Sequence, residues 1–315
     1  MEWKTRVTEL LGCKYPIIEG AFGVSEGTWQ LAAAVAEAGA HGTITASCSR
    51  TPEQLREDIR RCRDATDGSF GVNISVGVCP QIEKMLEVCA EEGVVLETST
   101  YKPDALVPRI KEAGLKWIHK VAMVKDALYA EKLGADAVIL VGLEGYVFKT
   151  PSILPLFTTI TWGARQIKIP IIAAGGIGDA RGFLGALGMG AEGIMMGSAF
   201  LVTKESAMSE RDKEAAVRLS PDNPQLRHRT LSTPDLKHYE QVMKMRNQLP
   251  LDEWVPMLRS AALEVPGADD TMSRLPPVSL AVAAIDHVPT VKELIDSIIQ
   301  GAEEILDSWQ FLKAR

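Results

Sequence analysis

Short apolar segments alternate with helical segments along the first two thirds of the chain, and this alternation constrains the fold most strongly. Eight segments have the β-branched and apolar composition of buried strands, namely 15–19, 42–45, 70–74, 94–97, 117–121, 137–141, 170–174 and 193–196. Glycines end many of the intervening segments, as at helix C-caps. Eight β/α units in order predict an α/β fold of the (β/α)8 TIM-barrel type. A doubly wound sheet is disfavoured, since no early GxGxxG motif opens a dinucleotide-binding half.

The alternation stops at about residue 204. Residues 205–285 are charged, contain prolines and have helical spacing, which predicts a helical insertion, or lid, over the barrel mouth after the eighth strand. Apolar positions then recur at helical spacing from Val291 to Leu312, as in a final barrel helix. We therefore expect a barrel of residues 1–204 and 286–315, interrupted by the insertion of residues 205–285.

Composition excludes several classes of protein. The chain has 315 residues, 46% of them hydrophobic, which is enough for a large core. Its apolar runs are too short for a membrane span, and its start lacks the apolar region of a secretory signal. A net charge of −7 gives no basic surface for nucleic acid. The five cysteines form no CxxC pair and have no histidines at metal spacing, so we expect free thiols, no metal and a cytoplasmic location.

Two glycine-containing turns follow the last two predicted strands. The stretch IPIIAAGGIGD, residues 169–179, ends a buried strand in Gly175 and Gly176, and Gly197 and Ser198 follow the eighth strand. In barrels of this type the loops after strands seven and eight commonly hold a phosphate, and glycines let the backbone approach it closely. The sequence therefore predicts a phosphate site made by the main chain of these four residues.

Several motifs resemble one flavoprotein family. They are YPIIEGAF at 15–22, FGVN at 70–73, IHKV at 118–121 and PIIAAGGIGDARGFLGALGMGAEGIMMGSAFLVTKE at 170–205. This pattern is similar to the FMN-dependent TIM-barrel family that includes nitronate monooxygenases, once called 2-nitropropane dioxygenases, and the flavin type of enoyl-acyl-carrier-protein reductase. The resemblance covers roughly residues 6–204 and the closing helix. It implies an FMN-dependent oxidoreductase with the FMN phosphate on the two glycine-containing turns.

The resemblance also implies contacts to the flavin ring. They come from Ala21, Phe22, Asn73 and Gly142. Lys120 would place a cation near the N1/O2 edge of the ring, where the reduced flavin carries negative charge. His119 is the alternative, because a regular strand directs only one of two neighbouring side chains inward.

One loop departs from the family pattern. Family members usually carry a Glu-x-Gly-Gly-His loop after the sixth strand, and its histidine acts as a base or proton donor. This chain reads GLEGYVFKTP at 142–151, so Glu144 is in place but Phe148 stands at the histidine position. Tyr146 and Lys149 are then the candidates to donate a proton to, or neutralise, a developing oxyanion. Glu144 either acts as a base or hydrogen-bonds loop N–H groups.

The leading hypothesis from the resemblance is an oxidoreductase of the nitronate monooxygenase-like group, which oxidises or oxygenates a small organic substrate through flavin N5. The alternative is an FMN- and NAD(P)H-dependent reductase or isomerase of an activated C=C bond, as in an enoyl thioester. A flavin-free phosphate-binding barrel is a third possibility. The expected partner is a small molecule, with no nucleic acid or membrane, and the sequence leaves open both NAD(P)H as a co-substrate and a homodimer.

Overall fold

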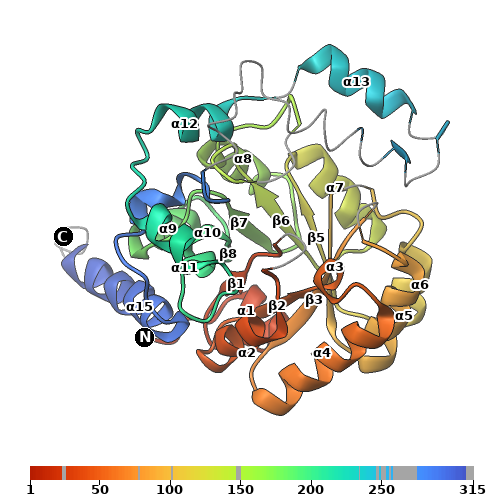
Figure 1. Cartoon of the computed structure of the whole chain (residues 1–315), viewed down its shortest axis with the longest axis horizontal. Helices are drawn as coiled ribbons and strands as arrows, with labels where there is room; N and C mark the ends of the chain where they lie inside the picture. Colours follow the sequence, from red (N-terminus) through yellow and green to blue (C-terminus); the bar gives the residue numbers. More distant parts are fainter. Residues whose placement is uncertain are drawn as a thin grey trace.

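The fold is a (β/α)8 barrel, as the alternation predicts. The computed structural model describes residues 1–22, 26–76, 79–100, 102–146, 150–233, 235–245, 248–249, 253–254, 257 and 275–309. Eight parallel strands form one sheet in the order β1-β8-β7-β6-β5-β4-β3-β2, and helices surround it (Figure 1). A bridge between Ile18 and His41 joins β1 to β2, so the barrel is nearly closed.

The strands lie where the sequence predicts them. They are β1 (Ile17–Glu19), β2 (Gly42–Thr45), β3 (Phe70–Ser75), β4 (Val95–Ser99), β5 (Trp117–Val121), β6 (Ala137–Val141), β7 (Ile171–Ala174) and β8 (Gly193–Met196). Both β1 and β7 begin directly after a proline, because Pro16 and Pro170 have no N–H group to donate to the sheet. The carboxyl end of β4 lies two residues beyond the predicted Glu97, because its pairing with β3 and β5 continues to Ser99.

Eleven described helices accompany the strands. They are α1 (Arg6–Leu11), α2 (Trp29–Glu37), α3 (Ala46–Ser49), α4 (Pro52–Ala65), α5 (Ile82–Glu92), α6 (Val107–Glu112), α7 (Val124–Leu133), α8 (Leu156–Gly163), α9 (Ala180–Gly188), α10 (Ser198–Leu201) and α15 (Val291–Ser308). Side-chain oxygens start several of them. Asp179 accepts the N–H of Gly182 at the start of α9, and Thr290 forms a capping box with Glu293 at the start of α15.

Strand side chains alternate between the barrel interior and the helix layer. The interior cluster contains Val7, Leu11, Ile18, Ile118, Ala137, Ile139, Val141, Ile172, Ala174 and Met195. Val7 and Leu11 belong to α1, which closes the amino end of the barrel. The neighbouring strand residues, such as Trp117 and Leu140, pack with the surrounding helices instead. Catalytic groups in this fold lie at the carboxyl ends of the strands, and the opposite end is occupied here by apolar packing.

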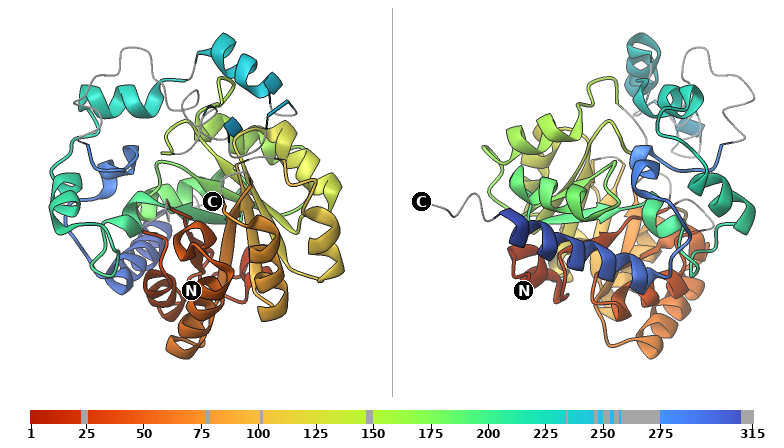
Figure 2. Two further views of the ribbon diagram at one scale, coloured as in Figure 1. Left: turned by 45° about the vertical axis from the view of Figure 1, so that its right-hand side comes forward. Right: turned by 90° about the vertical axis from the view of Figure 1, so that its left-hand side faces the viewer.

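The predicted insertion contains further helices. The structure describes α11 (Glu210–Val217), α12 (Pro224–Leu231), α13 (Leu236–Lys244) and the 3-10 helix η3 (Leu280–Ala284). Figure 2 shows α11 to α13 on the side of the barrel away from the N-terminus. The bounds of the insertion, 205 and 285, stay a prediction. None of the helices in the described ranges combines the length and apolar character needed to cross a membrane.

Candidate functional site

The turns after β7 and β8 form what we call the glycine side of the barrel mouth, residues 175–177 and 197–198. Gly175 and Gly176 have φ angles of +108° and +74°, which L side chains rarely adopt. A Cβ on Gly176 would lie 3.1 Å from Glu144 Cβ, and one on Gly197 would point toward Phe22, 3.7 Å from its Cε1. Side chains at these positions would fill the space that the two turns leave.

The backbone of the glycine side fits a phosphate. Within the described part of the chain, no acceptor pairs with the N–H groups of Gly176, Ile177, Gly197 or Ser198. Unpaired N–H groups on two adjacent turns suit an anion with several oxygens. The Ser198 hydroxyl is engaged elsewhere, because it accepts the N–H of Ser279 at 2.9 Å. Ser198 therefore offers its main chain rather than its hydroxyl, and the fit to the FMN phosphate rests on backbone groups.

The ends of β3, β4 and β5 form a second region, which we call the polar side: Asn73, Glu97 and Lys120. Glu97 Oε1 accepts a hydrogen bond from Asn73 Nδ2 at 2.9 Å and lies 3.3 Å from Lys120 Nζ. Asn73 Nδ2 also lies 3.3 Å from Ser99 Oγ, and Ser75 Oγ donates to Asn73 Oδ1. Asn73 is fully buried and Glu97 is 5% exposed. Burial leaves these polar groups dependent on one another.

Lys120 and His119 point to opposite sides of β5. Lys120 reaches Glu97 and follows the interior residue Ile118 by two positions. His119 Nδ1 lies 2.7 Å from Thr98 Oγ1, which also accepts the indole N–H of Trp117 among the helix-facing residues. Burial lowers the pKa of His119 to about 4, so its ring is neutral near pH 7. Lys120 is therefore the one of the two that is directed toward the mouth.

The loop after β6 packs against the glycine side. Glu144 accepts the backbone N–H of Leu156 at 2.9 Å, where α8 begins without a side-chain cap of its own. Gly142 is close-packed, since a Cβ there would lie 2.5 Å from Leu156 Cβ and 2.6 Å from Glu144 Oε2. The Glu144 carboxylate thus hydrogen-bonds the first N–H group of α8. Gly142 makes room for that contact.

Tyr146 connects the barrel to the insertion. Its side chain is 44% exposed, and the Arg229 guanidinium of α12 lies 4.8 Å from the centre of its ring. Arg229 also donates to the carbonyls of Pro276 and Val278 at 2.8 and 2.7 Å, and burial lowers the pKa of this guanidinium. Cation–π packing and these bonds hold Tyr146 next to α12. Phe148 and Lys149 lie outside the described residues.

The turn after β1 lies beside β2 and β8. The backbone N–H of Phe22 donates to Thr45 Oγ1 at 3.2 Å, and Gly20 donates to the carbonyl of Met196 at 2.8 Å. Both Ala21 and Phe22 are half-buried. The structure therefore brings Phe22, a predicted contact of the flavin ring, next to Gly197, a predicted contact of the phosphate.

A buried carboxyl group fills the seam between β1 and β2. Glu19 Oε2 accepts the N–H of Thr43 at 2.9 Å, and Oε1 has no partner within the described ranges. Burial raises the pKa of Glu19 well above its usual value, and the negative charge of Glu97 raises it further. The protonated form of Glu19 is therefore favoured, and it substitutes for a missing backbone pairing at the place where the barrel is least closed.

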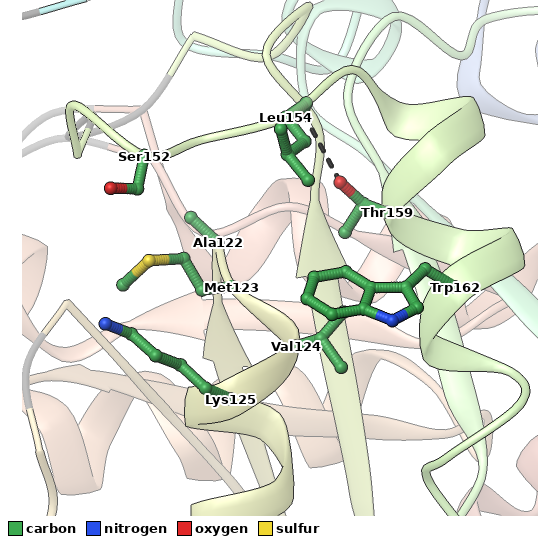
Figure 3. Close-up of a pocket in the computed structure, with 8 residues that line it drawn as sticks. All are labelled: Ala122, Met123, Val124, Lys125, Ser152, Leu154, Thr159 and Trp162. Carbon is green, nitrogen blue, oxygen red and sulfur yellow. Dashed lines mark hydrogen bonds between the residues drawn. The ribbon is translucent and has the colours of Figure 1, made fainter.

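An apolar pocket of about 220 Å³ lies between α7 and α8 (Figure 3). Its lining includes Met123, Val124, Leu154 and Trp162, with Lys125 at the same pocket. None of the sequence-predicted site residues lines it. No cluster of three or more possible metal ligands occurs among the described residues.

Glu97 and Arg229 are the site residues that sequence reasoning missed. A signal existed for Glu97, because a charged residue near the end of a barrel strand, at the same parity as Ser99, is directed into the mouth. No local signal existed for Arg229, since its contact with Tyr146 joins residues 83 positions apart. Only the packing of α12 over the loop after β6 brings them together.

Comparison with known proteins gives a consistent family pattern. The model of the family described as nitronate monooxygenase matches residues 4–92 and 77–301. A probable nitronate monooxygenase of Staphylococcus aureus (strain JH9) is 33% identical over an alignment of 258 positions, which covers 68% of this chain and 72% of the relative.

Two further similar proteins match nearly the whole chain. One is (3aS,4S,5R,7aS)-5-hydroxy-7a-methyl-1-oxo-octahydro-1H-indene-4-carboxyl-CoA dehydrogenase of Rhodococcus jostii (strain RHA1), 28% identical over an alignment of 354 positions that covers 99% of each chain. The other is the solved structure of FabK from Thermotoga maritima, with a TM-score of 0.77 and 33% identity, covering 98% of this chain and 99% of that chain.

Proposed function

Because the chain belongs to the nitronate monooxygenase family of FMN-dependent oxidoreductases, we propose that it transfers electrons between NAD(P)H and an activated C=C bond next to a thioester carbonyl. The Rhodococcus relative, which matches along 99% of both chains, is a dehydrogenase whose named substrate is a coenzyme A ester. We thus favour the NAD(P)H-dependent reductase, the second hypothesis from the sequence, over nitronate oxidation.

The preference for the reductase rests on the direction in which the His119 side chain points. A nitroalkane needs a base to remove its α-proton, and the family supplies a histidine for this. The sequence resemblance implies that Phe148 stands at that position, and His119 is buried against Thr98 with a pKa of about 4. An enoyl thioester needs no such base, because its reduction requires a hydride at the β-carbon and a proton at the α-carbon.

The residues of the mouth have distinct parts in this reaction. The N–H groups of the glycine side would hold the FMN phosphate, and Asn73 and Lys120 would face the ring system. FMN, when bound, supplies or accepts an electron pair at N5. Lys120 would stabilise negative charge that develops on the ring.

Tyr146 is the proposed hydrogen-bond donor to the substrate. Negative charge develops on the thioester oxygen as the β-carbon receives hydride, and a phenol O–H next to this oxygen stabilises it. The 44% exposure of Tyr146 leaves it accessible to a substrate, while Arg229 holds its ring from α12. Lys149 is a second proposed donor to the same oxygen.

Oxidation of nitronates is the second candidate function. It is supported by the family match and by the Staphylococcus aureus relative. A nitronate is already deprotonated, so the histidine replacement that the resemblance implies would remove less of the required chemistry.

Anaerobic stopped-flow measurements on the purified flavoprotein separate the two candidates. We expect NADH or NADPH to bleach the visible flavin absorbance and crotonyl-CoA to restore it without oxygen. Rapid bleaching by ethyl nitronate, together with no response to either nicotinamide, would favour nitronate oxidation and reject the proposed reductase.

The variant Tyr146→Phe sharpens this test. Phenylalanine keeps the ring against Arg229 but removes the O–H, so reoxidation by crotonyl-CoA should slow by about 10- to 100-fold. Reduction by NAD(P)H should keep its rate. Equal loss in both half-reactions would mean that Tyr146 positions FMN or the loop rather than the thioester oxygen.

A further inference from the structure

Glu97 lies at the centre of the polar side, although no sequence motif marks it. One carboxylate oxygen, Oε1, contacts both Lys120 Nζ at 3.3 Å and Asn73 Nδ2 at 2.9 Å. The side chains of Glu97 and Lys120 are 6% and 14% exposed. Glu97 therefore joins the two side chains that the proposed function directs toward the flavin ring.

The ion pair changes what a neighbouring ring would experience. A buried cation next to an electron acceptor stabilises the reduced, negatively charged form, and burial strengthens this effect relative to water. A carboxylate 3.3 Å from the ammonium group opposes it. An acceptor at the mouth would respond to the sum of the two charges, and not to Lys120 alone.

Neighbouring groups leave Glu97 as the main partner of Lys120. Glu19 is the other buried carboxyl group nearby, but its raised pKa favours the neutral form, and its Oε2 accepts the N–H of Thr43. The serine hydroxyls at 75 and 99 lie 3.0 Å from each other and bond Asn73. These contacts hold the amide of Asn73 without supplying charge.

We propose that Glu97 is a positioning residue that fixes Lys120 and Asn73 at the barrel mouth and, by offsetting the charge of Lys120, lowers the reduction potential of the bound flavin. This inference rests on the proposed binding of FMN. It assigns Glu97 a role that a structural buried carboxylate would not have, because it predicts opposite electrochemical effects for the two members of the pair.

The test measures the midpoint potential of bound FMN in Glu97→Gln, Lys120→Met and the double variant. At the potential where the wild-type flavin is half reduced, we expect the ratio of reduced to oxidised flavin to rise about tenfold in Glu97→Gln and to fall about tenfold in Lys120→Met. The double variant should return close to the wild-type ratio. Glu92→Gln is the matched control. The Glu92 side chain is also largely buried and ion-paired, but its partners are arginines of α4.

Thermal unfolding of the apoprotein gives a readout that needs no flavin. Either single variant leaves one partner of a buried pair without its counter-charge, so each should lower the melting temperature. The double variant should be more stable than the sum of the two losses predicts. If Glu97→Gln does not fold alone, folding of the double variant shows that removing the Lys120 charge rescues it, which sets a lower bound on the coupling.

The outcomes separate this inference from the proposed function. Wild-type protein that does not bind FMN would overturn the proposed function and the electrochemical role of Glu97 together. Bound FMN whose potential is the same in Glu97→Gln as in wild type would overturn the inference alone. Additive losses in apoprotein stability would also overturn it, because they would show that Glu97 does not hold Lys120.

Discussion

The glycine side and the polar side of the barrel mouth are built from different parts of the chain. The glycine side presents backbone N–H groups from turns whose residues have no side chain or direct it away. The polar side presents the side-chain ends of Asn73, Glu97 and Lys120, which lie near the carboxyl ends of β3, β4 and β5. A backbone site is fixed by φ and ψ, whereas a side-chain site is fixed by its partners.

This difference indicates which kind of substitution should damage each side. On the glycine side, a side chain added at a glycine would obstruct the predicted site, because the backbone N–H groups themselves would bind the phosphate. On the polar side, removing an atom does the damage, since each buried group relies on the next for a hydrogen bond. Substitutions can therefore test the two sides in opposite senses.

The largest effect is expected on the glycine side. Gly176→Leu places a side chain at φ +74°, with its Cβ 3.1 Å from Glu144 Cβ, so FMN affinity should fall by about 100-fold or more. Titration of apoprotein with FMN, followed by fluorescence quenching, measures this. Gly185→Leu is the control, because its Cβ would meet no atom within 4 Å and the helix α9 continues unchanged. Full FMN binding by Gly176→Leu would contradict the phosphate site.

A smaller effect is expected on the polar side. Asn73→Ala removes the 2.9 Å hydrogen bond to Glu97 Oε1, so the protein should lose about 1–3 kcal/mol of unfolding free energy. FMN affinity should fall by about tenfold, since the phosphate contacts remain. Urea unfolding and FMN titration check both values. Ser75→Ala, which removes the 3.3 Å contact to Asn73 Oδ1 and the 3.0 Å contact to Ser99 Oγ but leaves the bond to Glu97, should cost less than Asn73→Ala.

Glu19, at the seam between β1 and β2, should make the stability of the protein depend on pH. The pKa of Glu19 is raised in the folded protein, so the folded state binds more protons than the unfolded state, and stability should fall as pH rises above the ordinary carboxyl pKa. Glu19→Gln removes this dependence, and its stability relative to wild type should increase as pH rises above about 5. Melting temperatures across that range measure it. A constant difference would show that Glu19 is ionised in the fold.

The smallest effect is expected for Glu144→Gln. The amide oxygen of glutamine can still accept the N–H of Leu156, so the change should cost less than about 1 kcal/mol. The pH profile of thioester reduction should stay as in wild type. A loss of about 100-fold in rate with normal stability would instead assign Glu144 to proton transfer.

The sequence was a good guide to features that depend on local chemistry. Apolar runs between prolines and glycines predict all eight strands, and Asp179 predicts the start of α9, because burial on both faces and N-capping leave local patterns. The paired turns after β7 and β8 are also as predicted. Whether they hold a phosphate stays a prediction.

Contacts between distant residues were beyond the sequence. The choice between His119 and Lys120 depends on strand register, which the sequence alone left open. Arg229 meets Tyr146 only because α12 folds back over the barrel. The roles of the predicted site residues, including Lys149 outside the described ranges, are testable by the variants above.

The bond between Ser198 and Ser279 has a consequence for cofactor retention. Ser279 lies at the returning end of the insertion, where its N–H donates to the Ser198 hydroxyl and its own hydroxyl accepts the N–H of Ala281. The same Ser198 offers its N–H to the predicted phosphate. Docking of this chain segment and the proposed binding of FMN would therefore share Ser198, and by thermodynamic reciprocity each should strengthen the other.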